Sequence, residues 1–240
     1  MLRLTKSMFL IGLVVMSFAL FVSCSDDDDS PTSGDVTIPD APEMSFALHP
    51  GAGVGSNFII IFPLVSGATE YRLYQSADGT TYTGLDTNSA TDYAAYGYGF
   101  FSVSTASDTY FYIKAYNSKG EGGAGPVVFA EPSNFSSAGS FISYPASGQT
   151  IGDLTPTFTI ASVGGASMYA IGVYTAGGDV WDAVMTSGLS CTYGETTADV
   201  VTFGNVTALT YGTYGVGIEA INSNNWGFLK DDNSFDIISK

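Results

Sequence analysis

The sequence contains few basic residues, and this scarcity excludes a large class of partners. Only 7 of the 240 residues are lysine or arginine, against 23 aspartate and glutamate residues, so the formal net charge is −16 at pH 7. A surface of this sign repels the phosphate backbone of nucleic acids, whose binding depends on clustered basic side chains. We therefore expect no nucleic-acid partner.

Residues that carry most enzymatic and metal chemistry are also scarce. The chain has a single histidine, His49, beside a proline and a glycine-rich stretch, and it has no Gly-x-Ser-x-Gly nucleophile motif. Acidic residues such as Asp78, Asp86 and Asp92 are scattered through segments that resemble turns. We therefore predict a loop position for His49, no enzymatic activity, and no cofactor or metal site.

Cysteine is limited to Cys24 and Cys191. If Cys24 is chemically modified, Cys191 has no disulfide partner, and no disulfide stabilises either half of the chain. A lone cysteine between a serine and a threonine is more often a small buried apolar side chain than a reactive thiol.

What the sequence does contain favours β-structure. Hydrophobic residues make up 45% of the chain, with 29 glycines, 16 phenylalanines and 15 tyrosines. Aromatic and β-branched residues are enriched in strands, whereas glycine weakens a helix interior by about 1 kcal/mol relative to alanine. The length suffices for one or two domains of roughly 100–200 residues each. We therefore predict an all-β protein.

The N-terminus has the pattern of an export signal. Arg3 and Lys6 precede 16 uncharged apolar or small residues, 7–22, fewer than the roughly 20 that a membrane-spanning helix needs. The stretch ends in Phe-Val-Ser-Cys at Cys24. This ending resembles the lipobox of bacterial lipoproteins, although Phe21 stands where that family usually has leucine. The resemblance implies a signal peptide over residues 1–23 and lipidation of Cys24; an ordinary secretory signal is the alternative.

Residues 24–39 are predicted to be the lipidated cysteine and an acidic, disordered tether. Four consecutive aspartates, residues 26–29, stand just after the cysteine. They resemble the acidic signal that directs Bacteroidetes-type lipoproteins to the outer face of the outer membrane, and a plain solvated linker is the alternative. We therefore expect a cell-envelope protein, anchored to the membrane by acyl chains, in the outer membrane and exposed at the surface.

The remainder of the chain repeats itself. Residues 62–73 match residues 160–171 at an offset of 98, and residues 113–118 match residues 218–223 at an offset of 105. Two blocks in the same order and at nearly the same separation indicate a tandem repeat. Proline and serine interrupt the β pattern near residue 132. We predict one domain over residues 40–132 and a second over residues 133–240, joined by a short linker as a semi-rigid rod.

Each repeat has the two-residue period of β-strands. Phe58, Ile60 and Phe62 lie on one side of a strand. Apolar residues also occupy every second position from Tyr214 to Ala220, with Gly215, Gly217 and Glu219 between them. One apolar face and one solvated face are typical of antiparallel sheets that pack in pairs. We predict two tandem antiparallel Greek-key β-sandwiches, with Gly215, Gly217 and Glu219 facing solvent.

The repeats resemble fibronectin type III domains, an immunoglobulin-like family. In that family a Val-x-Gly-Ala turn leads to a tyrosine in strand C, which is matched by Tyr71 and Tyr169. A run Tyr-x-x-x-Val-x-Ala-x-Asn forms strand F, and it is matched from Tyr214 to Asn222. The resemblance implies the same sandwich fold for both repeats.

Two departures from this family pattern have structural consequences. The tryptophan that ends strand B in the family is replaced by Phe62 and Ile160. In the first repeat the strand F tyrosine position holds Thr109, and Tyr110 comes one residue later. A shift by one residue turns Tyr110 to the opposite face of the strand, which puts the tyrosine corner of this repeat in doubt unless a bulge absorbs the shift.

Aromatic residues in expected loops are the candidate ligand contacts: Tyr93, Tyr96, Tyr98, Trp181 and Trp226. Trp226 falls in the expected F–G loop, and Trp181 lies near the expected C–C′ turn. Exposed rings beside polar residues are typical of sugar stacking and of protein interaction hot spots. The alternative is that these rings fill the sandwich cores.

These observations predict a non-catalytic cell-envelope lipoprotein whose two modules serve binding, adhesion or scaffolding, with a glycan or an extracellular protein as partner. One alternative is an accessory carbohydrate-binding lipoprotein of a glycan-uptake system, which requires Trp181 and Trp226 to be exposed on one face. The other is a passive spacer or stalk, which predicts that the rings are buried.

Overall fold

The computed structural model describes residues 36–49, 55–203 and 206–239. Residues Val36–Lys240 form one compact unit. The predicted signal peptide, Cys24 and all but the end of the predicted tether lie outside the described residues. Among the residues described, no helix is long and apolar enough to cross a membrane.

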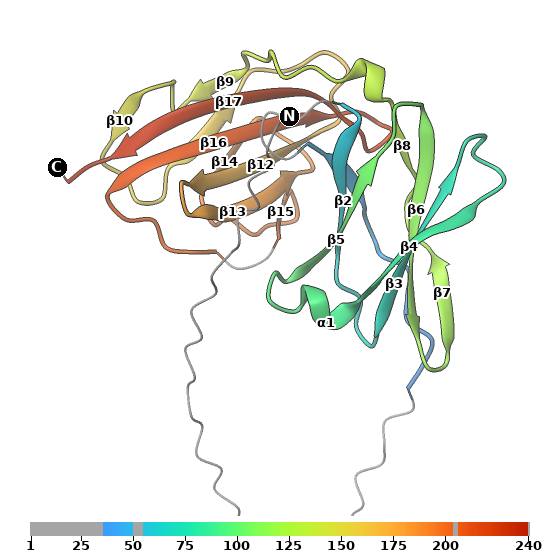
Figure 1. Ribbon diagram of the computed structural model, residues 1–240. Helices are drawn as coiled ribbons and strands as arrows, with labels where there is room; N and C mark the ends of the chain where they lie inside the picture. The colour runs from blue at the N-terminus through green and yellow to red at the C-terminus, as the bar shows by residue number, and fades with distance from the viewer. Residues whose placement is uncertain (1–35, 50–54, 204–205, 240) are drawn as a thin grey trace, which may run out of the picture. The chain divides into compact units, whose positions relative to one another are not determined.

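Within these ranges the fold is almost entirely β-structure, as the composition predicted, with one short helix, α1 (Ala90–Tyr93), and a single 3-10 turn, η1 (Pro132–Asn134). Figure 1 shows the strands in two groups, joined through η1. The strands are β1 (Phe46–Leu48), β2 (Asn57–Pro63), β3 (Glu70–Ser76), β4 (Thr83–Ser89), β5 (Tyr98–Ser104), β6 (Thr109–Asn117), β7 (Gly120–Ala124), β8 (Val128–Ala130), β9 (Ile142–Tyr144), β10 (Gln149–Ile151), β11 (Thr157–Ile160), β12 (Met168–Thr175), β13 (Gly178–Met185), β14 (Ser190–Thr192), β15 (Val200–Phe203), β16 (Gly212–Ile221) and β17 (Gly227–Ile237).

The strands before η1 form the first sandwich. One sheet has the order β1-β2-β5, and the other has the order β4-β3-β6-β7, with β8 also paired to β6. The chain therefore leaves the first sheet after β2 and returns to it at β5, which is a Greek-key connection. The two sheets enclose one apolar core, because alternate residues of β2, β3, β5 and β6 point between them.

The strands after η1 form the second sandwich. A three-stranded sheet, β14-β11-β9, faces a six-stranded sheet, β10-β17-β16-β12-β13-β15. The named strands pair antiparallel except for β10 with β17. A second apolar core lies between these sheets. The two sandwiches confirm the predicted all-β, antiparallel fold.

The side chains of Tyr214 and Tyr110 lie on the faces that the strand registers predicted. The Tyr214 hydroxyl accepts a hydrogen bond from Thr210 N and donates one to Thr210 O, both at 3.0 Å, which is a tyrosine corner. In β6 the core positions are odd-numbered, so Tyr110 points away from the core and stacks on Phe129 at 4.3 Å. The pairing of β6 with β3 contains no bulge. The first sandwich therefore lacks this corner at Tyr110.

The outer faces of the two sandwiches bury a third apolar cluster. Strand β2 is apolar on both sides: Phe58, Ile60 and Phe62 point into its own core, and Ile61 points outward. The outward side of β1 and β2 packs on the outward side of the six-stranded sheet. The buried members of this junction are Phe46, Ile61, Ala170, Val184, Phe203 and Ile221.

The turn between β16 and β17 adds a second contact between the sandwiches. Ala47 N donates to Asn225 O and Phe129 N donates to Asn224 O, both at 2.9 Å, so the turn lies between β1 and β8. Asn225 has φ +58°, a left-handed conformation that asparagine tolerates. This conformation directs Trp226 into the core of the first sandwich. The short linker alone predicted a semi-rigid rod; the structure adds a lateral contact that the sequence analysis did not predict.

The tyrosine corner leads to the first prediction. Tyr214→Phe removes a buried hydroxyl that makes two backbone hydrogen bonds, so the free energy of unfolding should fall by about 0.5–1.5 kcal/mol. Tyr110→Phe is the matched control, because the Tyr110 hydroxyl makes no corner. Urea unfolding followed by circular dichroism measures both, and equal losses would contradict the assignment.

The Trp226 contact leads to the second prediction. Trp226→Ala leaves a cavity where the second sandwich inserts into the first, and should cost about 3–5 kcal/mol of unfolding free energy. Trp226→Phe should cost less, because it keeps a ring against Phe58 and His49. The exposed Tyr211 provides the control, since Tyr211→Ala should be close to neutral in the same urea titration.

Candidate functional site

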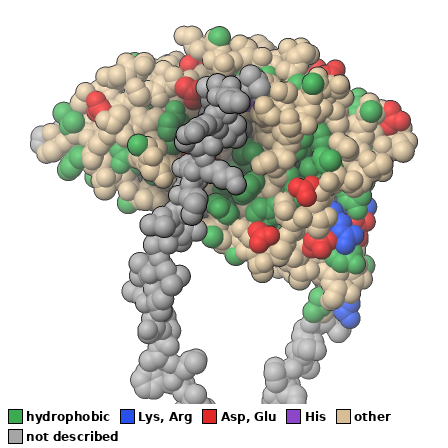
Figure 2. Space-filling view, in the orientation of Figure 1, with side chains coloured by type: hydrophobic (Ala, Val, Ile, Leu, Met, Phe, Trp, Pro, Cys, Tyr) green, Lys and Arg blue, Asp and Glu red, His purple; other side chains and the backbone are tan. Residues whose placement is uncertain are grey.

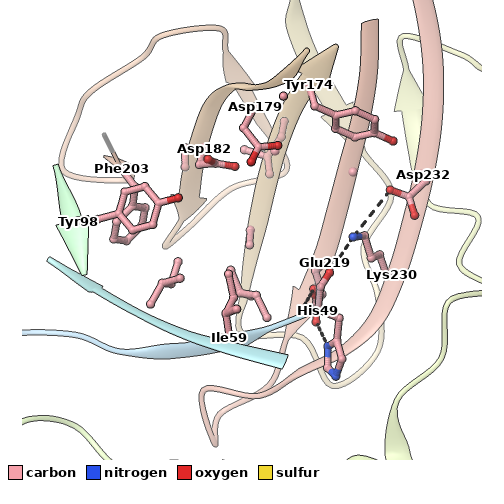
Figure 3. A pocket seen from close by; sticks show the side chains of 18 of the residues that line it. His49, Ile59, Tyr98, Tyr174, Asp179, Asp182, Phe203, Glu219, Lys230 and Asp232 are labelled. Carbon is pink, nitrogen blue, oxygen red and sulfur yellow. Dashed lines mark hydrogen bonds and ion pairs between the residues drawn. The ribbon is translucent and has the colours of Figure 1, made fainter. Parts of the chain in front are cut away.

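A cleft of about 320 Å³ lies beside the apolar junction, between β2 and β5 of the first sandwich and the outer face of the six-stranded sheet. Figure 3 shows Asp179 and Asp182 on the six-stranded sheet with Ile59 opposite them, Tyr98 and Phe203 at one end of the cleft, and His49, Glu219 and Lys230 at the other. One wall is apolar and the opposite side carries charge. The lining residues that the following paragraphs use are His49, Ile59, Ile61, Tyr98, Gly172, Tyr174, Asp179, Asp182, Phe203, Gly217, Glu219, Lys230 and Asp232.

A cross-strand row of four residues runs along the cleft. Asp182 is paired with Gly172, Gly172 with Gly217, and Gly217 with Asp232, so the row crosses β13, β12, β16 and β17. A Cβ added to Gly172 would lie 3.0 Å from Asp182 Oδ1, and one added to Gly217 would lie 2.7 Å from Asp232 Oδ1. The Asp182 and Asp232 carboxylates therefore lie over Gly172 and Gly217, where the strands carry no side chains.

Two tyrosines stand beside this row. Tyr174 lies across Gly215, where an added Cβ would come within 2.2 Å of the ring, so glycine is required for the ring to lie flat on the sheet. Tyr98 comes from β5 on the other sandwich and contacts the Phe203 ring at a centroid distance of 5.9 Å. Burial is the main cause that raises the pKa of both hydroxyls, and Asp179 adds to each. Both side chains are therefore neutral and border the acidic side.

A polar network closes one end of the cleft. His49 Nδ1 lies 2.6 Å from Glu219 Oε1, and the backbone N–H of His49 donates to Glu219 Oε2 at 2.9 Å. The imidazole stacks on Phe135 at 3.6 Å. Lys230 Nζ donates to the His49 carbonyl at 2.8 Å and lies 4.0 Å from Asp232. We call His49, Glu219 and Lys230 the junction network, since it links β16 and β17 to the end of β1.

The carboxylates of the cleft have unusual electrostatics. Burial, with a smaller contribution from the charge of Asp179, raises the pKa of Asp182 to about 7. Burial also raises the pKa of Asp232, against the opposing effect of Lys230. On the face drawn in Figure 2 the acidic side chains are scattered. Asp78, Asp86 and Asp92 are exposed, as predicted.

No group of three or more histidine, cysteine, aspartate or glutamate side chains is arranged to hold a metal ion within the described part of the chain.

The structure corrects three of the predicted ligand contacts. Trp181 is 1% exposed and Trp226 is 0% exposed. Trp181 lies in β13, where it packs on Phe158 and Tyr193 in the second core. Tyr93 is also buried, and its hydroxyl bonds to Phe100 O and Asn88. The glycan alternative required the two indoles to be exposed on one face, and this requirement is not met.

The other predicted residues have different positions. Tyr96 is 48% exposed, and Tyr98 lines the cleft. Cys191 is buried in the second core, and burial raises the pKa of its thiol to about 12, as suits an inert side chain.

The sequence analysis missed the residues that build the cleft. His49 lies just after β1, outside the strands, as predicted, but the sequence did not indicate that it is buried, 2% exposed, and bonded to Glu219. Glu219 and Gly217 were predicted to face solvent, but the first sandwich covers this side of β16, and Glu219 is 4% exposed. Two features of the sequence could have indicated that these outer faces are covered. One is the unbroken apolar run over residues 58–62, and the other is the pair of apolar outward residues Val184 and Ile221.

The junction network leads to the third prediction. His49→Ala leaves the Glu219 carboxylate buried beside an empty space, and should cost about 3–5 kcal/mol of unfolding free energy. Glu219→Gln should cost less, because glutamine still accepts the backbone N–H of His49. The double variant should lose less than the sum of the two single variants, which a double-mutant cycle measures. Glu70→Gln, which breaks the half-exposed Glu70–Arg72 pair, should have a much smaller effect.

Comparisons with known proteins give likenesses of fold but no family. No family model matches the sequence, and no curated protein matches it. Solved structures that resemble this one include "Structure of FN3tt mut", at 17% identity over 37% of this chain and 90% of that chain, with a TM-score of 0.30. Another contains the FN1–FN3 domains of chicken CNTN1, at 16% identity over 85% and 68%, with a TM-score of 0.29. A third contains the fibronectin(III)-like modules of Clostridium thermocellum CbhA, at 12% identity over 82% and 95%, with a TM-score of 0.27. At these scores the likenesses carry no argument about this chain.

Proposed function

We propose that this chain is a non-catalytic cell-envelope lipoprotein that presents two fibronectin type III-like sandwiches as one binding or scaffolding unit at the bacterial surface. Acyl chains on Cys24 hold it to the membrane, and the acidic tether gives it reach. Its partner is a molecule outside the cell that enters the cleft between the sandwiches.

The anchor is supported by the sequence. The apolar stretch before Cys24 is shorter than a membrane-spanning helix. Each buried acyl CH₂ contributes about 0.8 kcal/mol to membrane binding, so two or more chains on one N-terminal cysteine suffice for stable anchoring.

The observation that carries the binding function is the cleft itself. A passive spacer needs two folded modules and a linker, but it needs no cleft with aligned carboxylates and rings. Here both sandwiches contribute lining residues, and these residues belong to one compact unit. The buried rings satisfy the spacer alternative as well, so the cleft is what favours binding.

The non-catalytic assignment follows from how the reactive groups are engaged. His49 is buried between rings and bonded to Glu219, so its imidazole does not reach a molecule in the cleft. Cys191 is buried in an apolar core. The remaining carboxylates of the cleft are suited to binding a ligand by charge.

The anchor leads to the fourth prediction. In a bacterial host that processes lipoproteins, radiolabelled palmitate should label the wild-type chain and Cys191→Ser, but not Cys24→Ala, because acylation requires the thiol at position 24. Mass spectrometry should find an acylated cysteine as the first residue of the mature chain. An unmodified Cys24 thiol would contradict the anchor, and resistance to protease added to intact cells would contradict surface exposure.

A further inference from the structure

We propose that the cleft binds an organic cation, an ammonium or guanidinium group carried on an apolar stem, of the kind found in the side chains of lysine and arginine. This inference deepens the proposed binding function and rests on it for the biological setting, but the chemistry of the cleft supports it independently.

The first argument is charge balance. The buried Glu219 is hydrogen-bonded to the backbone and the imidazole of His49, and Lys230 lies beside Asp232 and bonds to the His49 carbonyl. Asp179 and Asp182 have no such cation among the residues that the structure describes. The influences on Asp182 are burial and the like charge of Asp179, both of which disfavour its carboxylate form. A bound cation would offset both unfavourable effects by favouring the carboxylate form.

The second argument is the apolar wall. Ile59 of β2 lies across the cleft from the carboxylates, and the ring of Phe203 lies beside Asp182, its cross-strand partner. Phe203 is already buried in the junction, whereas Ile59 is only partly buried. A methylene stem would cover the remaining apolar surface of Ile59 better than a small hydrated ion. The volume of about 320 Å³ lies at the small end of ligand sites. It suits a single side chain or a small amine better than a long polymer.

The third argument is the arrangement of the cross-strand row and the rings. Gly172 and Gly217 leave room for the Asp182 and Asp232 carboxylates to lie over them, which places acceptor oxygens at each end of the row. Tyr98 and Tyr174 border the row, and aromatic rings near a carboxylate also attract cations. Anions are repelled from this site, and a neutral sugar would leave the charge of Asp179 and Asp182 unmatched.

The experiment measures binding to the full chain in detergent by isothermal titration calorimetry. The probes are butylamine and butylguanidine, with butanol and butyrate as neutral and anionic analogues of the same stem, and glucose as a sugar. We expect the two cations to bind and the other three probes to give no signal.

Asp182→Asn is the informative variant, because it keeps the side-chain shape and removes the charge. It should weaken cation binding by roughly tenfold or more. Asp108→Asn is the matched control: it removes one negative charge from an exposed position of the first sandwich that does not line the cleft. Circular dichroism should show that both variants are folded.

The pH dependence gives a second measurement that does not depend on a variant. A proton on Asp182 competes with the cation, so with a pKa of about 7 the affinity should rise about tenfold between pH 6 and pH 8. The other titratable or charged groups facing the cleft are Asp179, Tyr98, His49, Tyr174, Glu219, Lys230 and Asp232. The dependence should be lost in Asp182→Asn, which assigns it to this carboxylate.

A glycine-flanked lysine peptide then identifies the source of the cation. Tighter binding of the peptide than of butylamine indicates a side chain of a protein partner, and equal binding indicates a free amine; both results support the site. Equal cation binding by wild type and Asp182→Asn, binding of glucose instead, or no binding of any probe would each overturn the inference. None of these results affects the test of Cys24 acylation, so failure of the site and failure of the anchor remain distinguishable.

Discussion

The structure depends on the burial of side chains on both faces of the same strands. A β-sandwich needs only one apolar face on each sheet, yet β2 places Phe58, Ile60 and Phe62 inside the first core and Ile61 against the second sandwich. Burial of a single valine, isoleucine or phenylalanine side chain contributes about 1.5–3 kcal/mol. A few such residues therefore outweigh any surface ion pair, and the apolar junction, more than the linker at η1, holds the two sandwiches together.

The polar contacts at the junction determine how the sandwiches meet. Apolar surfaces attract one another without strong directional preference, whereas the His49–Glu219 pair and the backbone bonds of the β16–β17 turn form only in one register. A buried carboxylate adds little net stability even when it is paired, but it is costly to leave without its partner. Together with Trp226, the junction network therefore selects one arrangement of the two modules.

Much of the fold was accessible from the sequence because a sandwich is encoded by local patterns. The offsets between the two repeats, the strand period of two and the match at Tyr71, Tyr169 and Tyr214 predicted both sandwiches. The position of Tyr110 predicted the face on which its ring lies. All of these depend on residues that are close in sequence or that repeat at a fixed spacing.

The cleft could not be predicted from the sequence in the same way, because it depends on which outer faces of the two sandwiches pack together. The same alternation that identified the core of β16 also predicted solvent on its other side, and nothing local to Glu219 indicates that His49, 170 residues away, covers it. Trp226 beside asparagines has the composition of a binding loop, and only the docking of that turn on β1 and β8 shows that its partner lies within the same chain. Patterns within one module cannot report contacts between modules.

The glycine row is the feature that the stability of the fold does not explain. Glycine in a strand interior costs about 0.5–1 kcal/mol relative to alanine, and β-branched residues pack better on central strands. Gly172 and Gly217 nevertheless lie side by side in β12 and β16, the two inner strands of the six-stranded sheet, with an aspartate beside each. A surface that served only to pack against the first sandwich would continue the apolar pattern of Val184 and Ile221. Instead, the glycines make room for the Asp182 and Asp232 carboxylates, so the sheet sacrifices packing at this point to place charged groups beside the cleft, as the proposed cation site requires.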